Sequence, residues 1–306
     1  MTKLTVGTRG SVLALRQTNQ IVEVLMGLHP GLLIEVVVIK TKGDMILDVP
    51  LAKIDDKGLF VSELENALLS GEVDFAVHSM KDLPTEIPAG LCIAAIPERI
   101  DSCDVLITNG PGLEDLPGEA RIGSSSLRRG AQLKNFRSDL RITDLRGNLD
   151  TRLRKLDEGE YGGIVLAFAG LYRMGWTDRI SSRIPTEICL PAVGQGALAI
   201  EARDGDSEVI GLLKALDHQE SRTAVAAERS LLQALGGGCQ VPIGALGVIE
   251  QGILKLTGVI ADVDGSTLVR GEVSGKPEEA ESLGQELAGI LLAGGGEEIL
   301  KGMVDG

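Results

Sequence analysis

Aromatic residues are scarce in this chain of 306 residues, where they make up only 2%. Proteins that bind single-stranded nucleic acids use aromatic side chains as platforms on which bases stack, so this composition argues against that class. Positive charge is also in short supply, because the formal net charge is −14 and the sequence pI is about 4.8. A chain with this balance is not a general binder of polyanions, and no nucleic-acid partner is expected.

Targeting and metal-binding signals are missing as well. The first 25 residues carry Lys3, Arg9, Arg16 and Glu23 without an apolar core between them, which is unlike a secretory signal. No apolar run reaches the length of a membrane span. No spacing typical of metal ligands groups the cysteines and histidines, which are Cys92, Cys103, Cys189, Cys239, His29, His78 and His218. We therefore expect a reduced, metal-free protein of the cytoplasm with no membrane partner.

Positive charge is concentrated in one stretch, residues 121–154. Nine cations face only three anions there, although the whole chain is acidic. The cations are Arg121, Arg128, Arg129, Lys134, Arg137, Arg141, Arg146, Arg152 and Arg154, and the anions are Asp139, Asp144 and Asp150. This stretch is therefore the first candidate for a binding site.

The basic stretch consists of repeated units of strand, small polar turn and helix. One unit comprises residues 121–133, a second comprises residues 140–156, and residues 4–26 form a similar unit that contains Arg9 and Ser11. Such turns direct free backbone N–H groups and the positive end of a helix dipole at one point, and arginine adds forked donors that match carboxylates. Ligands of parallel sheets bind at the carboxyl ends of the strands. We predict a site for a multiply charged anion; the alternative is a solvated basic helix face with surface ion pairs.

The rest of the chain predicts two α/β lobes and a smaller domain. Hydrophobic residues make up 43%, enough for buried cores, and the length favours two or three domains. Further strands are expected at residues 31–39, 73–77, 91–96, 104–108, 162–167 and 197–202. Residues 97–102 and 191–196 are candidate hinges, and residues 41–58 are a candidate lid. After residue 217 we expect a helix to 235, three strands and a helix at 277–292. The lobes would form a clamp with the ligand between them.

Three residues outside the basic stretch are candidates for chemistry. Cys239 follows three glycines that let the backbone present it on a tight loop, so it is a candidate nucleophile or covalent attachment point; the alternative is a buried, inert cysteine. Asp82 follows a short apolar strand, where it is either functional or a turn-forming residue before Pro84. His78, on the same strand, is interpreted as a core histidine.

Seven motifs in order carry a resemblance to a known family. They are Thr8-Arg9-Gly10-Ser11-Val12-Leu13-Ala14, Lys57-Gly58-Leu59-Phe60, Val77-His78-Ser79-Met80-Lys81-Asp82, Gly123-Ser124-Ser125-Ser126-Leu127-Arg128-Arg129, Leu145-Arg146-Gly147-Asn148, Leu190-Pro191-Ala192-Val193-Gly194-Gln195-Gly196-Ala197 and Gly237-Gly238-Cys239-Gln240-Val241-Pro242-Ile243-Gly244. The chain resembles the porphobilinogen deaminase (hydroxymethylbilane synthase) family over nearly its whole length.

The resemblance implies a fold and a reaction. The fold has two lobes like those of type II periplasmic binding proteins, residues 1–97 with 197–216 and residues 102–191, and a small α+β domain, residues 217–306. The reaction is a transferase reaction of tetrapyrrole and haem biosynthesis, in which four porphobilinogen molecules condense head to tail with loss of ammonia. A dipyrromethane primer is held through a thioether, here on Cys239, and the expected state is a monomer.

The resemblance also implies roles for individual residues. Asp82 matches the catalytic aspartate, which stabilises cations and shuttles protons. The residues expected to bind the cofactor, besides Cys239, are Ser79, Lys81, Ser124, Ser126, Arg128, Arg129, Arg146, Gly147 and Arg152. Those expected to bind the substrate are Arg9, Ser11, Phe60, Arg173 and Gln195.

Two alternative functions stay open. One is a non-catalytic two-lobed binding protein for a small polyanion, and the other is a Cys–His hydrolase that uses Cys239 and His78.

Overall fold

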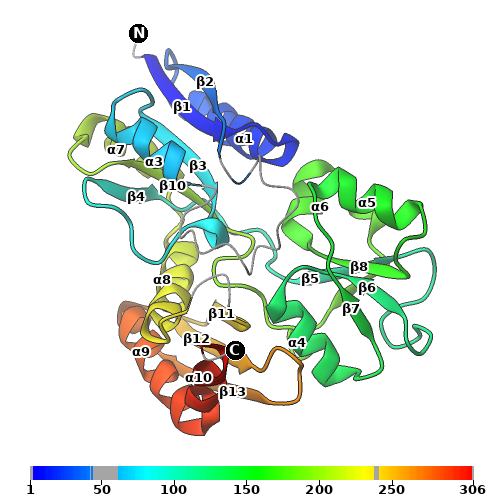
Figure 1. Ribbon diagram of the computed structural model, residues 1–306. Coiled ribbons are helices and arrows are strands. Elements are labelled where there is room, and N and C mark those ends of the chain that lie inside the picture. The colour runs from blue at the N-terminus through cyan, green and yellow to red at the C-terminus, as the bar shows by residue number, and fades with distance from the viewer. Residues whose placement is uncertain (1–2, 42, 44–60, 238–240, 305–306) are drawn as a thin grey trace. The chain divides into compact units, whose positions relative to one another are not determined.

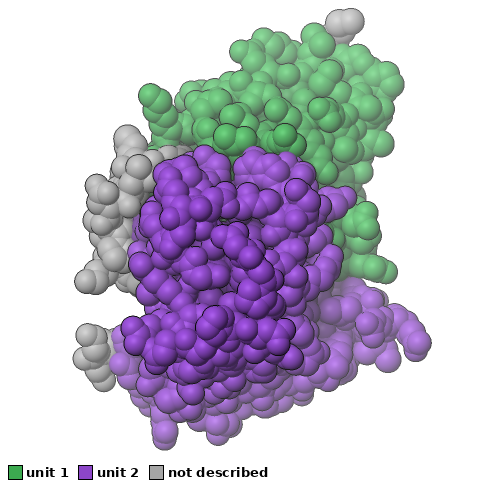
Figure 2. Space-filling model, turned by 90° about the vertical axis from the view of Figure 1, so that its right-hand side faces the viewer, with its two compact units in different colours: residues 1–49, 55–100, 197–222 green, residues 50–54, 101–196, 223–306 purple. Residues whose placement is uncertain are grey.

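A computed structural model describes residues 3–41, 43, 61–237 and 241–304 (Figure 1). The chain divides into two compact units. The described part of unit 1 comprises residues 3–41, 43, 61–100 and 197–222, and that of unit 2 comprises residues 101–196, 223–237 and 241–304 (Figure 2). The chain therefore passes from unit 1 to unit 2 after residue 100 and returns after residue 196, close to the two predicted hinges.

Unit 1 is built on a five-stranded sheet with the order β2-β1-β3-β10-β4. Its strands are β1 (Lys3–Arg9), β2 (Leu33–Ile39), β3 (Phe75–Ser79), β4 (Leu91–Ala95) and β10 (Leu198–Arg203). Strands β2 and β3 run parallel to β1, whereas β10 is antiparallel to both β3 and β4. The strand expected at residues 197–202 thus does rejoin the first sheet.

Helices cover both faces of this sheet because alternate strand residues point to opposite sides. The helices of unit 1 are α1 (Val12–Leu28), α3 (Ser62–Leu69) and α7 (Ser207–Leu213), with short 3₁₀ turns η2 (Met80–Asp82) and η4 (Lys214–Leu216). Phe75 and Val77 pack in one core with Leu25 of α1, whereas Ala76 packs in another core with Leu68 of α3.

The first part of unit 2, residues 101–196, repeats this arrangement. Its sheet has the order β7-β6-β8-β5-β9, formed by β5 (Asp104–Thr108), β6 (Arg121–Gly123), β7 (Arg141–Thr143), β8 (Gly163–Ala167) and β9 (Ser182–Ile184). Strands β7 and β8 are parallel to β6, and β5 is antiparallel to both of its neighbours. The helices are α4 (Leu127–Phe136), α5 (Leu149–Asp157) and α6 (Phe168–Met174), followed by the 3₁₀ turn η3 (Thr177–Arg179). Helices α4 and α5 lie on opposite faces of the sheet (Figure 1).

The two sheets have equivalent strand orders. In each, three parallel strands are followed by one antiparallel strand and then by an outer strand, and the antiparallel strand (β10 or β5) is the first one formed after the chain has crossed from the other unit. This topology confirms the predicted fold class, two similar α/β lobes of the type II periplasmic-binding-protein kind.

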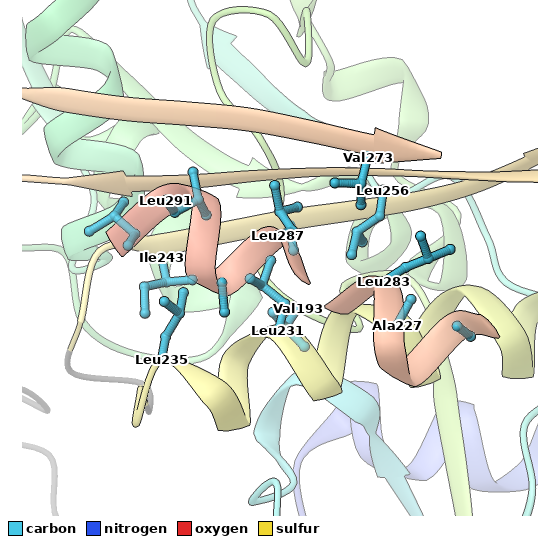
Figure 3. Close-up of a cluster of buried hydrophobic side chains, with 14 of the residues drawn as sticks. Val193, Ala227, Leu231, Leu235, Ile243, Leu256, Val273, Leu283, Leu287 and Leu291 are labelled. Carbon is cyan, nitrogen blue, oxygen red and sulfur yellow. The ribbon is translucent and has the colours of Figure 1, made fainter. Parts of the chain in front are cut away.

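The second part of unit 2 is a small α+β region. Three antiparallel strands, β11 (Ile243–Glu250), β12 (Ile253–Ala261) and β13 (Leu268–Gly275), form its sheet. Its helices are α8 (Gln219–Ala234), whose first four residues belong to unit 1, α9 (Ala280–Leu291) and α10 (Glu297–Val304), with short turns η5 (Pro277–Glu279) and η6 (Leu292–Gly296). Leu231, Leu256 and Leu287 meet in its core, which fills the space between α8, α9 and the strands (Figure 3).

Glu228 of α8 joins the two parts of unit 2. Its side chain is completely buried, and its two carboxylate oxygens accept hydrogen bonds from the backbone N–H groups of Gly194 (2.7 Å) and Gly247 (2.8 Å). Since a buried carboxylate is tolerated only when it is well hydrogen-bonded, this residue fixes the segment before residue 196 against β11. The predicted separation of residues 102–191 from residues 217–306 stays a prediction, because both regions belong to one compact unit.

The contact between α8 and α9 leads to a stability prediction. A Cβ atom at Gly284 would lie 2.6 Å from the backbone oxygen of Ala227, whereas one at Gly289, on the same helix, would meet nothing within 4 Å. Gly284→Ala should lower the free energy of unfolding by about 1–3 kcal/mol through overpacking. The control Gly289→Ala should raise it by roughly 0.5–1 kcal/mol through helix propensity. Urea unfolding measures both, and equal stabilities would contradict the close approach of the helices.

Candidate active site

In unit 1, the predicted site residues follow β1 and β3, which are parallel neighbours with Gly7 opposite Ala76. Arg9 ends β1 and Ser11 is the N-cap of α1, where its Oγ accepts a hydrogen bond from the Ala14 N–H at 3.3 Å. Serine at this position satisfies a free N–H of the first turn. Because the carboxyl ends of parallel neighbouring strands emerge on the same edge, β1 delivers its polar residues beside those of β3.

The end of β3 carries the other group of predicted residues. Ser79 is its last residue, and Lys81 and Asp82 lie in the 3₁₀ turn η2. The backbone N–H of Met80 donates to the Ala197 carbonyl at 3.0 Å, and the Gln17 side chain of α1 donates to Ser79 Oγ at 3.1 Å. These contacts fix the strand end against both β10 and α1. Unit 1 therefore brings Arg9, Ser11, Ser79, Lys81 and Asp82 to one edge of its sheet.

His78 points into the protein rather than toward this edge. Only 4% of the residue is exposed, and its Nε2 lies 3.0 Å from a carboxylate oxygen of the completely buried Glu201, a close contact without the alignment of a hydrogen bond. Glu65 of α3 lies in the same interior, where burial raises the pKa of its carboxyl. His78 is thus a core residue, in agreement with its interpretation from the sequence.

In unit 2, two polar turns are joined by one hydroxyl group. Ser125 Oγ donates to the carbonyl of Leu145 at 2.6 Å and accepts from the N–H of the same residue at 3.1 Å. Ser126 is the N-cap of α4, and Ser124 Oγ accepts from the Ser126 N–H at 3.3 Å. The turn after β6 and the turn after β7 are therefore in direct contact, which brings Arg146 close to the start of α4.

The second turn contains a buried guanidinium nitrogen of Arg146. Arg146 Nη1 is buried and has no hydrogen-bond partner among the residues that the structure describes. Beside it, Gly147 has φ of +112°, which favours glycine, and Arg152 Nε donates to the Gly147 carbonyl at 2.8 Å. A buried donor without a partner is costly, so this turn is suited to an anionic ligand that would complete it.

Arg128 and Arg129 have a different environment from the one that the sequence suggested. They are only 5% and 6% exposed, and both contact the completely buried Asp104, Arg128 at 2.7 Å and Arg129 at 2.7 Å. Burial alone would raise the pKa of Asp104, but the two guanidinium groups outweigh it and hold that pKa well below its usual range. Asp104 was not among the site residues predicted from the sequence, where it is marked only as an aspartate at the start of the first strand after a predicted hinge.

Gln195 belongs to the same cluster. Its side chain is 1% exposed and its Nε2 donates to the carbonyl of Ser102 at 2.7 Å and to Asp104 at 2.9 Å. This burial fits a positioning role better than the substrate contact expected for it.

Arg173 of α6 is also largely enclosed. It donates to the Gly196 carbonyl at 2.8 Å, and burial lowers its pKa to about 10, which leaves it cationic at neutral pH.

Some predicted features cannot be placed. Phe60, Cys239 and the candidate lid, residues 41–58 apart from Thr41 and Gly43, lie outside the described residues.

Within the described ranges no group of three or more histidine, cysteine, aspartate or glutamate side chains could hold a metal ion. Likewise, none of the helices in those ranges is long and apolar enough to cross a membrane.

Comparison with known proteins identifies the family. The family model described as "Porphobilinogen deaminase, dipyromethane cofactor binding domain" matches residues 4–211. A second family model, described as "Porphobilinogen deaminase, C-terminal domain", matches residues 222–293. The porphobilinogen deaminase of Pelotomaculum thermopropionicum is 54% identical over 98% of this chain and 96% of its own length. That of Desulforamulus reducens is 51% identical over 98% and 97%. The chain therefore belongs to the porphobilinogen deaminase family.

Proposed function

We propose that this chain joins four porphobilinogen molecules head to tail into hydroxymethylbilane, with consumption of one water and release of four ammonia molecules. It forms C–C bonds between pyrroles and is therefore a transferase. The observation that carries this function is the match of residues 4–211 to the cofactor-binding domain of the family, together with relatives at 50–54% identity over nearly the full chain.

The residues present fit a dipyrromethane, whose acetate and propionate groups are anionic. The unsatisfied Arg146 Nη1 and the N-terminus of α4 are donors suited to carboxylates. When bound, the cofactor supplies the pyrrole carbon to which the first substrate unit is added. We propose that Cys239 forms the thioether and that the carboxylates are held by Ser79, Lys81, Ser124, Ser126, Arg146, Gly147 and Arg152, with Arg128 and Arg129 contributing positive charge from the interior.

Asp82 is proposed as the catalytic residue. Departure of ammonia from porphobilinogen leaves positive charge on the substrate, and a carboxylate in the site stabilises that charge. After the C–C bond has formed, the same carboxylate accepts the proton that the pyrrole ring must lose. The position of Asp82 in η2, directly after the strand end fixed by Ala197 and Gln17, supports this role because the backbone that carries the carboxylate is anchored.

Arg9, Ser11 and Arg173 are proposed to bind the carboxylates of the incoming substrate, with Phe60 as a further substrate-side residue, whereas Gln195 is proposed to act from the interior as a positioning residue. We also propose a cytoplasmic monomer. The free thiols of Cys92, Cys103 and Cys189 support a reducing compartment. A non-catalytic binding protein for a small polyanion, the alternative considered from the sequence, is not favoured by the family match, and the Cys–His hydrolase has no support from it either.

Covalent attachment of the cofactor can be tested by mass. Protein made in a host that synthesises porphobilinogen should exceed its sequence mass by one dipyrromethane under denaturing conditions, and an acidic aldehyde reagent for pyrroles should colour it. Cys239→Ala should show the unmodified mass, because no thioether can form, whereas Cys92→Ala should keep the added mass. Loss of the added mass in Cys92→Ala would show that the attachment residue was wrongly assigned.

The proposed role of Asp82 predicts a kinetic defect without loss of the cofactor. Asp82→Asn should lower kcat by about 10²–10⁴-fold, the usual contribution of a general acid–base group, while the loaded mass and the thermal midpoint stay close to those of the wild type. Glu86→Gln, which changes an exposed carboxylate four residues away, is the matched control and should turn over normally. Normal turnover by Asp82→Asn would exclude this carboxylate as the proton carrier.

The unsatisfied nitrogen of Arg146 predicts a loading defect. Arg146→Gln should reduce the fraction of protein that carries the cofactor by about tenfold or more, since hydrogen bonds to charged groups are worth about 1.5–3 kcal/mol. Its thermal midpoint should change little. The control Arg141→Gln removes an exposed arginine that pairs with Glu119 and should load fully. Equal loading of the two variants, measured by intact mass, would argue against an anion-binding role for Arg146.

A further inference from the structure

Asp104, the first residue of β5, receives an unusually large number of contacts for one carboxylate. Arg128 Nη1 donates to Oδ2 at 2.7 Å, and Arg129 donates to Oδ1 from Nε at 2.9 Å and from Nη2 at 2.7 Å. Gln195 Nε2 adds a hydrogen bond to Oδ1 at 2.9 Å, and the Cys189 thiol approaches Oδ2 at 3.4 Å. All five side chains are buried, so none of these contacts is weakened by solvent.

The charges in this cluster do not cancel. Two guanidinium groups face one carboxylate, which leaves an excess of one positive charge in the interior at the start of α4. Without Asp104 the two arginines would repel each other in a medium of low dielectric constant. The carboxylate therefore makes the adjacent arginine pair possible, and it does so at the helix end whose N-cap, Ser126, receives the Arg129 N–H at 3.4 Å.

The cluster also joins segments that are distant in sequence. Arg128 Nη1 donates to the carbonyl of Leu190 at 2.6 Å, Arg129 Nη1 donates to that of Val165 at 3.2 Å, and Gln195 donates to that of Ser102 at 2.7 Å. Asp104 thus holds α4 against β8 and against the two segments that lead to the neighbouring unit. A shift of this carboxylate would move the first turn of α4. Ser124 and Ser126, which directly precede that turn, would move with it.

We infer that Asp104 is a positioning residue for cofactor binding: it sets the direction of the Arg128 and Arg129 side chains and so fixes the turn of residues 124–126 in the form that accepts carboxylates. This inference rests on the proposed function of that turn. It gives Arg128 and Arg129 a role in which their charge attracts the cofactor, while the Arg129 donors named above and the Nη1 of Arg128 are used by the protein; Arg128 Nε is buried without a partner among the described residues.

A purely structural role for Asp104 can be separated from a positioning role with a control in the same helix. Gln132 is 1% exposed and exchanges two hydrogen bonds with the backbone of Leu190, accepting at 2.8 Å and donating at 3.1 Å. It supports the same segment as Arg128 but carries no charge, and none of its hydrogen bonds reaches Asp104. Gln132→Leu should therefore lower the thermal midpoint and leave the cofactor content unchanged.

The experiment compares Asp104→Asn, Asp104→Glu and Gln132→Leu in the full chain, made in a host that synthesises porphobilinogen. Denatured intact mass gives the loaded fraction of folded protein, and thermal unfolding gives stability. Asp104→Asn should load about tenfold less than the wild type, since removing one partner of a buried ion pair is strongly unfavourable. Asp104→Glu keeps the charge but displaces it by one methylene group. Its loaded fraction should therefore lie between that of Asp104→Asn and that of the wild type.

The outcomes are distinct. If Asp104→Asn binds as much cofactor as the wild type, the inference is overturned. It is also overturned if Gln132→Leu and Asp104→Asn have the same thermal midpoint and lose the same fraction of cofactor. If Asp104→Asn does not fold, Asp104→Glu decides, and full loading in that variant overturns the positioning role. A wild-type protein without added mass would refute the proposed function instead, before any variant is considered.

Discussion

The structure of unit 2 depends on one buried carboxylate between two arginines. Asp104 is completely enclosed, and the contacts it receives from α4 and from Gln195 make an otherwise unfavourable arrangement of like charges stable. The cost of placing these charges in the interior is offset by the ion pairs with Asp104 and by the hydrogen bonds of the two guanidinium groups to backbone carbonyls. The same arrangement gives an acidic protein a local region of positive potential, which a substrate with carboxylate groups requires.

The sequence was sufficient for the parts of the fold that depend on local order. The units of strand, polar turn and helix are visible in the spacing of apolar residues, and Ser11 was recognisable as an N-cap because such caps need only neighbouring residues. The edges where Asp82 and Arg146 lie also followed from the sequence, since the carboxyl ends of parallel strands meet on one side of a sheet.

Contacts between distant residues could not be predicted in this way. Asp104 is 24 residues from Arg128 and 91 residues from Gln195, and no local pattern shows that an arginine at a helix start turns inward to meet a carboxylate. The close approach of Gly284 to Ala227 and the short strand β9 were missed for the same reason, because they depend on packing between elements. The sequence showed where the arginines are concentrated, but it did not show which residues they contact.

The position of β10 has a consequence for the order in which the protein can be completed during synthesis. Strand β10 lies between β3 and β4, so the sheet of unit 1 is not continuous until residues 198–203 have left the ribosome. The five-stranded sheet of unit 2 needs nothing beyond residue 184. The lobe that begins the polypeptide is therefore the later of the two to close, and the unpaired edges of β3 and β4 must avoid other chains while residues 96–203, about one third of the protein, are translated.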